Sequence, residues 1–298
     1  MPTLTAYVAN CLMGGDEVTP YPDGSWVRDI VRFKCGKWEF RFRQHPDVAQ
    51  GNTESLKGTF CKTSTVEVEG VEPNQFDGVL EALDAICWLL SFAGQSRVVC
   101  YGHHFPEGTT TGRFTSVAGT ANYFRPPIDL RDGAAVKSFI EQTYPEFRRL
   151  SKKRKLSAVF DYLVQADKES QPTEVRLLLL FVSLECLKDT YARETRIPYL
   201  KGSYRKPAKR PGKPGEKFTF EELLLQMLRS VGVRKGLKQV VALRNEIIHS
   251  GFSRKSHLRQ WQMYERVQDL IREYVFRLLA YRGEVFAYAS QGMTVKKV

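Results

Sequence analysis

The 298-residue sequence has no run of about 20 uncharged apolar residues, the length that a membrane-spanning helix requires. Its longest apolar segment, 175–187, contains Arg176 and Glu185 and therefore predicts a buried helix. The first residues lack a basic segment followed by an apolar run, which predicts no secretory signal. No Gly-x-x-x-x-Gly-Lys-Ser/Thr motif occurs, which argues against P-loop nucleotide chemistry. The absence of a membrane-spanning segment and of a secretory signal favours a cytoplasmic protein without membrane contact.

Cysteine and histidine are sparse and poorly spaced for disulfides or metal sites. None of the six cysteines belongs to a Cys-x-x-Cys pair. The nearest approach to a metal-binding motif is Cys100-x-x-His103-His104, which lacks a second pair of ligands. We therefore expect idle thiols in a reducing compartment, with no metal and no other cofactor.

Positive charge is concentrated in the second half of the chain. The formal net charge is +12. Residues 1–133 contain 12 Lys/Arg and 16 Asp/Glu, whereas residues 134–298 contain 33 and 17, a net of +16. A polyanion such as RNA is the natural partner of this half, and a solvated basic surface that aids solubility is the alternative.

The first part of the sequence has the alternation of apolar and polar residues that is typical of strands. This pattern covers 38–43 and 65–69, and strand character returns at 96–101. Between the last two segments an amphipathic helix is predicted over about 75–92. We therefore expect a β-rich N-terminal domain over 1–133 with one or two helices.

Beyond residue 133 the apolar spacing changes to that of helices. Helical segments are predicted near 134–148, 152–167, 172–192, 218–231, 234–249 and 255–281. The third is apolar on nearly every face and should be the central core helix. The sequence thus predicts an α+β protein in which an all-α helical bundle at 134–285 follows the β-rich domain, with a tail at 286–298.

A basic, proline-rich segment at 193–217 separates the third and fourth predicted helices. It contains nine Lys/Arg, two Asp/Glu and four prolines, so we expect a flexible loop without regular structure. Its cations predict an arm that orders on RNA phosphates, although a plain surface loop is equally compatible. The candidate RNA-binding residues are Lys201, Arg205, Lys206, Lys209, Arg210 and Lys213.

Residues 243–251, Leu-Arg-Asn-Glu-Ile-Ile-His-Ser-Gly, contain the candidate catalytic residues Arg244, Asn245 and His249. Gly251 is a suitable helix C-cap, which places His249 in the last helical turn. Asn245 and His249 are four residues apart and share a face. Arg244 lies about 140° from His249 around the helix, so one straight helix does not direct both side chains at one phosphate.

The chemistry of RNA cleavage suits these residue types. The ribose 2′-hydroxyl is a nucleophile within the substrate, so the protein has to supply a proton carrier and a cation for the phosphorane charge. Histidine exchanges protons near neutral pH, and the planar arginine fork matches two phosphate oxygens. Asn245 would orient either group or contact the phosphate. In the alternative interpretation Asn245 and His249 satisfy a helix end, and Arg244 pairs with a carboxylate such as Glu185.

The second half resembles the HEPN superfamily, whose helical bundles carry Arg-x4–6-His late in the domain, often with Asn after the Arg. Arg244, Asn245 and His249 match this motif. Residues 181–187 are similar to the core helix of ApeA-like HEPN domains, which carries an acidic residue within an apolar run. Residues 83–92 are similar to regions that precede such domains, so the resemblance covers the second half well and the first half loosely.

The resemblance implies a metal-independent endoribonuclease that leaves 2′,3′-cyclic phosphate and 5′-hydroxyl ends. It also implies a homodimer whose two motifs face one cleft, and a role in phage defence or as a toxin. Glu185 then either positions Arg244 or forms a structural ion pair. The N-terminal domain would sense a protein or phage-derived trigger. Because some family members bind RNA without cutting it, a non-catalytic RNA-binding or adaptor protein is the alternative.

Overall fold

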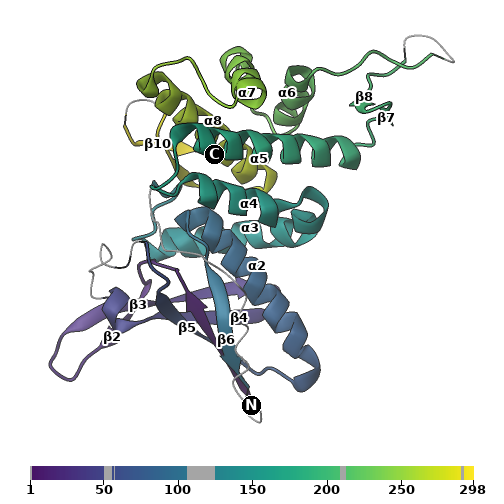
Figure 1. The fold of residues 1–298 in the computed structure, drawn as a ribbon. Coiled ribbons are helices and arrows are strands. Elements are labelled where there is room, and N and C mark those ends of the chain that lie inside the picture. The colour runs from purple at the N-terminus through teal and green to yellow at the C-terminus, as the bar shows by residue number, and fades with distance from the viewer. Residues whose placement is uncertain (1, 50–55, 57, 106–124, 209–212, 290–291) are drawn as a thin grey trace. The chain divides into compact units, whose positions relative to one another are not determined.

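The computed structural model describes residues 2–49, 56, 58–105, 125–208, 213–289 and 292–298. Over these residues the chain is mixed α+β, with an antiparallel sheet in its N-terminal part and mainly helices after it (Figure 1). The predicted fold class is confirmed. Contacts divide the chain into two compact units, Met1–Arg148 with Leu279–Val298, and Arg149–Leu278.

A six-stranded antiparallel sheet of order β2-β3-β4-β5-β1-β6 forms the centre of the first unit. Its strands are β1 (Thr3–Ala9), β2 (Glu17–Pro20), β3 (Trp26–Cys35), β4 (Trp38–Gln44), β5 (Lys62–Glu69) and β6 (Val99–His104). The alternation predicted for β4 and β5 is confirmed. Phe42 and Val66 pair in register and are fully buried, whereas the next pair, Arg41 and Glu67, forms a 2.7 Å ion pair on the other face.

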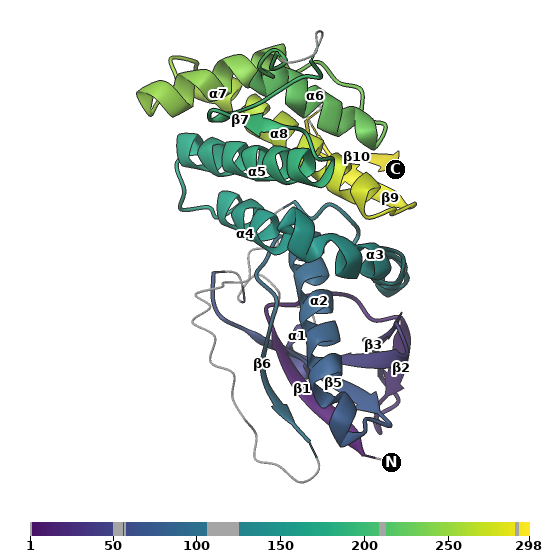
Figure 2. The same ribbon diagram turned by 90° about the vertical axis from the view of Figure 1, so that its right-hand side faces the viewer.

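Helices and a second hairpin complete the first unit. They are α1 (Pro46–Ala49), the 3₁₀ turn η2 (Pro73–Gln75), α2 (Phe76–Gly94), α3 (Gly133–Arg154), β9 (Glu284–Ala287) and β10 (Thr294–Lys297). Helix α2, which occupies the predicted position, lies across one face of the sheet (Figure 2). The segment expected to be a tail forms the β9–β10 hairpin instead.

The first part of α3 belongs with the sheet. The ring centroid of Phe139 lies 6.3 Å from that of Phe92 on α2 and 5.4 Å from that of Tyr281. Glu141 also accepts a hydrogen bond from the backbone N–H of Lys34 at 2.8 Å. The predicted domain boundary at residue 133 coincides with the start of α3, but these contacts group the chain up to residue 148 with the first unit.

Helices make up most of the second unit. They are α4 (Leu156–Ala166), α5 (Thr173–Glu194), α6 (Phe220–Ser230), α7 (Lys238–Ser250) and α8 (His257–Leu278), and a short hairpin of β7 (Tyr199–Leu200) and β8 (Ser203–Tyr204) follows α5. Helix α5 lies between α4 on one side and α6 and α7 on the other, and it also contacts α8 (Figures 1 and 2). The prediction that this apolar segment is the central helix is confirmed. No helix in the described ranges has the length and apolar character needed to cross a membrane.

A buried arginine ties the end of α3 to α5 and α8. Arg154 is 2% exposed, and its guanidinium donates to the Tyr274 hydroxyl at 2.6 Å and to the Leu187 carbonyl at 3.1 Å. A third contact, at 3.1 Å, reaches the carboxylate of Glu194. Because a buried charge is destabilising unless it is paired and hydrogen-bonded, these contacts hold residues 149–154, the last turns of α3, against α5 and α8 within the second unit.

A second buried charge joins α4 to α8. Asp167, which is fully buried at the end of α4, pairs with Arg272 at 3.2 Å and accepts hydrogen bonds from the Tyr264 hydroxyl and the Gln268 amide. Burial raises the pKa of Asp167, while the Arg272 charge and these hydrogen bonds act in the opposite direction. All three partners lie on α8, so the position of α4 along α8 is fixed.

Substitution of Asp167 should destabilise the helical unit. Asp167→Asn removes the charge that faces buried Arg272, and we expect the free energy of unfolding to fall by about 3–5 kcal/mol. Urea denaturation followed by circular dichroism measures this change. Asp161→Asn, at a half-buried position on the same helix, is the control and should change it by less than about 1 kcal/mol. Equal stability of the two variants would contradict the assigned role of Asp167.

Candidate active site

Helix α7 carries the candidate catalytic residues and ends where the sequence indicates. Gly251 caps it with a φ of 77°, and its N–H donates to the carbonyl of Ile247 at 2.9 Å. A side chain would be strained in this left-handed conformation, so the cap favours glycine. His249 consequently lies in the last helical turn, as predicted, and is exposed.

Arg244 is held by contacts with two other helices. Its Nη2 donates to Oε1 of Glu185 on α5 at 2.6 Å, and its Nη1 donates to Oδ1 of Asn245 at 3.0 Å. The guanidinium carbon lies 4.8 Å from the ring centroid of Phe220 on α6, a cation–π distance. The Arg244 side chain is 20% exposed, so its position is fixed while part of it remains accessible.

Glu185 faces two cations. Its second carboxylate oxygen accepts a hydrogen bond from the Lys188 ammonium, which also lies 4.8 Å from the Phe220 ring. We call Glu185, Lys188, Phe220 and Arg244 the arginine cluster. One carboxylate opposes two cations in this cluster, so its net charge is positive and it suits an anionic ligand.

The arginine cluster leaves hydrogen-bonding capacity on Arg244. A guanidinium carries more N–H groups than the hydrogen bonds to Glu185 and Asn245 use, with a second N–H on each terminal nitrogen. These N–H groups can donate to the oxygens of a phosphate. The geometry therefore combines a fixed cation with unfilled donors.

Asn245 connects the arginine cluster with the histidine. It is exposed, it accepts the hydrogen bond from Arg244, and it shares a helix face with His249. His249 has no hydrogen-bonding or ionic partner within the described ranges. The imidazole is thus accessible to a ligand, about 140° around α7 from Arg244.

Arg244, Asn245, His249 and Glu185 are predicted from the sequence, whereas Lys188 and Phe220, the other two members of the arginine cluster, are not. Lys188 was detectable, because it follows Glu185 by three residues and therefore lies beside it on a helix. Phe220 gave no local signal, because it reaches Arg244 only through the packing of α6 beside α5 and α7.

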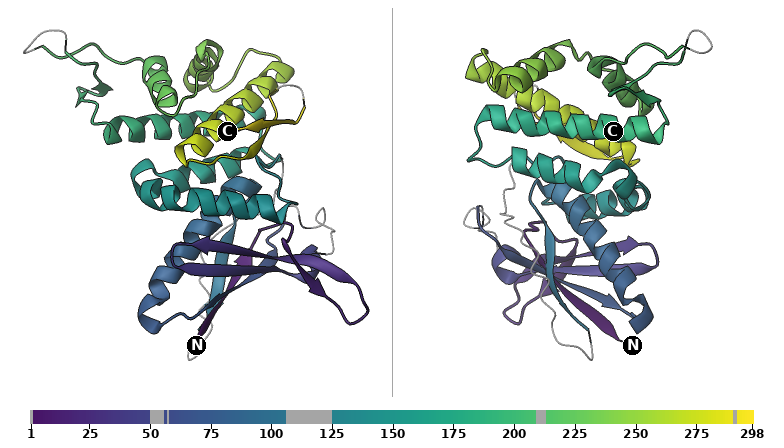
Figure 3. Two further views of the ribbon diagram at one scale, coloured as in Figure 1. Left: turned by 180° about the vertical axis from the view of Figure 1, so that it is seen from behind. Right: turned by 45° about the vertical axis from the view of Figure 1, so that its right-hand side comes forward.

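The basic segment at 193–217 contains regular structure, so the expectation that its prolines exclude such structure is wrong for 199–204. The β7–β8 hairpin lies near the C-terminal end of α5 (Figure 3). Its Tyr204 hydroxyl hydrogen-bonds Asp189 of α5, and burial together with this carboxylate raises the pKa of Tyr204 to about 12. Pro198 and Pro207 flank the hairpin without interrupting its ladder.

The candidate RNA-binding residues of this segment differ in their surroundings. Lys201 and Lys213 are exposed and Arg205 is half-buried. Lys206 forms an ion pair with Glu222 in the first turn of α6, so its charge is already matched. Lys209 and Arg210 lie outside the described residues.

None of the thiols or candidate metal ligands is a member of the arginine cluster, although Cys186 follows Glu185 in the chain. All six cysteines are free, and burial raises the thiol pKa of Cys11 and of Cys35 to about 12, which keeps both protonated at neutral pH. In the part of the chain that the structure describes, no three His, Cys, Asp or Glu side chains gather as a metal-binding group.

Comparison with known proteins adds no relative, because no family model, no curated protein and no solved structure matches the chain. The proposed resemblance to HEPN proteins is untested by these comparisons and rests on the residues at 83–92, 181–187 and 244–249.

The Lys206–Glu222 ion pair should make the folding stability of the protein depend on pH in the acid range. Glu222 also forms a capping box with Thr219. The hydrogen bond from Lys206, followed by that from the Thr219 N–H, lowers the Glu222 pKa from 4.5 to about 2. The stabilisation is therefore complete above pH 4.5 and is lost as the pH falls through about 2.

We expect Glu222→Gln to lower the urea midpoint at pH 7, and the difference from wild type to shrink as the pH approaches 2. Denaturation across this pH range measures it. Glu169→Gln, at an exposed position whose side chain has no hydrogen bond or ion pair among the described residues, should leave the midpoint unchanged at every pH. A difference that is independent of pH would show that the carboxylate charge is not responsible.

Proposed function

We propose that the protein is a metal-independent endoribonuclease of the HEPN type. The observation that carries the proposal is the arrangement on α7, where Glu185 and Phe220 fix Arg244 and the last turn exposes His249 without a partner in the described residues. A fixed cation suits the charge stabilisation, and an accessible imidazole suits the proton transfer, that RNA cleavage by the 2′-hydroxyl requires.

In the proposed reaction the 2′-oxygen attacks the adjacent phosphorus and the bond from phosphorus to the 5′-oxygen breaks. The imidazolium of His249 donates a proton to the leaving 5′-oxygen. A second, neutral imidazole, that of His249 in a second copy of the chain, takes the proton of the 2′-hydroxyl. Arg244 binds two phosphate oxygens and stabilises the phosphorane charge. The products are a 2′,3′-cyclic phosphate and a 5′-hydroxyl.

A homodimer fits this chemistry better than a single chain. Two proton-transfer roles call for two imidazoles, and Arg244 and His249 lie on different sides of α7. Exposed apolar side chains stand near the end of α7 and at the start of α8: Ile248 is 41%, Phe252 54% and Leu258 65% exposed. Such a surface suits contact with a second copy, which would bring the two motifs into one cleft.

The charge distribution supports RNA as the substrate, since the second half carries the whole positive excess.

We further propose that the N-terminal unit receives a protein or phage-derived trigger and that the enzyme acts in the cytoplasm, in phage defence or as a toxin. A non-catalytic RNA-binding or adaptor protein is the competing function, and it requires RNA affinity without cleavage.

Cleavage of a mixed RNA pool by the full-length protein in EDTA tests the proposal. We expect products with cyclic phosphate ends, and a loss of at least about 100-fold in rate for His249→Ala and for Arg244→Ala. His104→Ala and Arg282→Ala, at exposed positions in the first unit, are matched controls that should cleave normally. Salt-dependent RNA binding with no cleavage would contradict the enzymatic proposal and support the adaptor.

Substitution of Glu185 separates a positioning role from a structural one. We expect Glu185→Ala to lower kcat about 10- to 100-fold with little change in KM, because Arg244 loses its anchor. Glu185→Gln should recover part of the rate, since its amide oxygen still accepts the hydrogen bond. Glu174→Ala, in the first turn of the same helix, is the control. If Glu185→Ala lowers the stability of the protein but leaves kcat unchanged, the role of Glu185 is structural only.

A further inference from the structure

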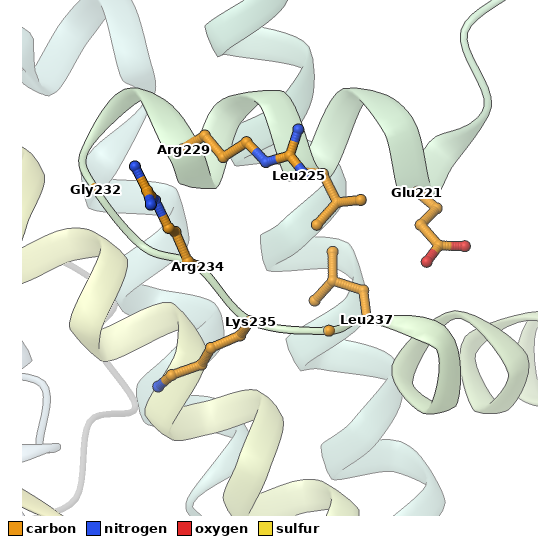
Figure 4. A pocket seen from close by; sticks show the side chains of 8 residues that line it. Glu221, Leu225, Arg229, Gly232, Arg234, Lys235 and Leu237 are labelled. Carbon is orange, nitrogen blue, oxygen red and sulfur yellow. The ribbon is translucent and has the colours of Figure 1, made fainter.

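A cavity of about 680 Å³ lies between α6 and the loop that leads into α7. It is distinct from the arginine cluster, since none of the cluster's residues lines it. The lining residues that matter here are Glu221, Leu225, Arg229, Arg234, Lys235 and Leu237 (Figure 4). Its volume is in the range of sites for small organic ligands.

The cavity combines an apolar centre with charged ends. The side chains of Leu225 and Leu237 approach each other from opposite walls, and Glu221 lies on the side away from Arg229 and Arg234 (Figure 4). A ligand that fits this arrangement has a flat, weakly polar body, an anionic group at one end and hydrogen-bond donors at the other.

The two arginines are available to an anion. Lys235 forms an ion pair with Glu273 of α8, so its charge is matched within the protein. Arg229 and Arg234 are exposed, and neither side chain has a hydrogen-bonding or ionic partner among the described residues. Two unmatched guanidiniums, one from α6 and one from the loop, line the cavity (Figure 4). They suit a phosphate, whose oxygens accept from planar N–H pairs.

The loop that borders the cavity leaves room for a ligand. It contains Gly232, with a φ of +80°, and Gly236, where an added Cβ would meet no atom within 4 Å. Gly236 is not in the left-handed region, so a larger residue there would occupy open space at the cavity wall without backbone strain. This position provides a way of narrowing the cavity.

We propose that this cavity binds a nucleoside monophosphate unit. The phosphate contacts Arg229 and Arg234, the base packs against the apolar surface of Leu225 and Leu237, and Glu221 accepts a hydrogen bond from an amino or hydroxyl group of the nucleoside. The unit comes either from a free nucleotide or from an RNA chain, since Leu237 at the cavity wall lies only about 10 Å along α7 from Arg244. The proposal concerns other residues than Arg244 and His249, so it does not depend on the proposed ribonuclease activity.

Isothermal titration calorimetry of the full-length protein with AMP, adenosine and inorganic phosphate tests the site. We expect AMP to bind at least about tenfold more tightly than either fragment, because only AMP uses both the guanidiniums and the apolar centre. The double variant Arg229→Ala/Arg234→Ala should weaken AMP binding at least about tenfold. The double variant Arg131→Ala/Arg282→Ala removes the same charge from exposed positions in the first unit and should leave binding unchanged.

Gly236→Leu gives a test that does not alter charge, and it should weaken AMP binding while the circular dichroism spectrum stays that of the wild type.

A pentaribonucleotide with 2′-O-methyl groups, which cannot be cleaved through its 2′-oxygen, distinguishes a free nucleotide from an RNA chain as the source of the bound unit. Tighter binding of the oligonucleotide than of AMP, lost in Arg229→Ala/Arg234→Ala, supports an RNA chain. Equal or weaker binding supports a free nucleotide.

Three results would overturn the proposal. They are no binding of either AMP or the oligonucleotide, inorganic phosphate binding as tightly as AMP, and AMP binding that is unchanged in Arg229→Ala/Arg234→Ala. Because none of these measurements involves cleavage, failure of this site and failure of the ribonuclease proposal are distinguishable.

Discussion

Two buried guanidiniums, those of Arg154 and Arg272, determine how the helices of the second unit pack. Each is 2% exposed and requires acceptors from neighbouring helices, because an unpaired charge in the interior is strongly destabilising. Arg154 finds them on α5 and α8, and Arg272 finds Asp167 at the end of α4. Helix α5 is held by this packing, and it presents Glu185 to Arg244 on the neighbouring helix.

The candidate active site divides its two tasks between different environments. Arg244 is fixed by Glu185 and Phe220, which suits a group that has to stabilise charge without rearranging. His249 is exposed in the last turn of α7, which suits a group that has to exchange protons with a substrate. Helix α7 therefore carries a fixed arginine, Arg244, in its middle and an accessible histidine, His249, in its last turn.

The sequence predicted those features of the fold that depend on residues close to one another in the chain. The alternation in β4, the apolar faces of α5 and the glycine cap of α7 each follow from residues close in sequence, and the structure contains all three. The contact of Phe220 with Arg244 and the ion pair of Lys206 with Glu222 depend on how separate segments pack. No residue pattern within either segment specifies its partner, so these contacts became visible only in the folded chain.

The path of the chain through the two units affects the order in which they can form. Residues 149–278 are inserted between two parts of the first unit. Tyr281, which follows this insertion in the chain, packs against Phe139, which precedes it. During synthesis the helical unit therefore emerges completely before the sheet unit obtains its remaining residues. On the ribosome, the half that carries Arg244 and His249 can fold while the other half is still incomplete.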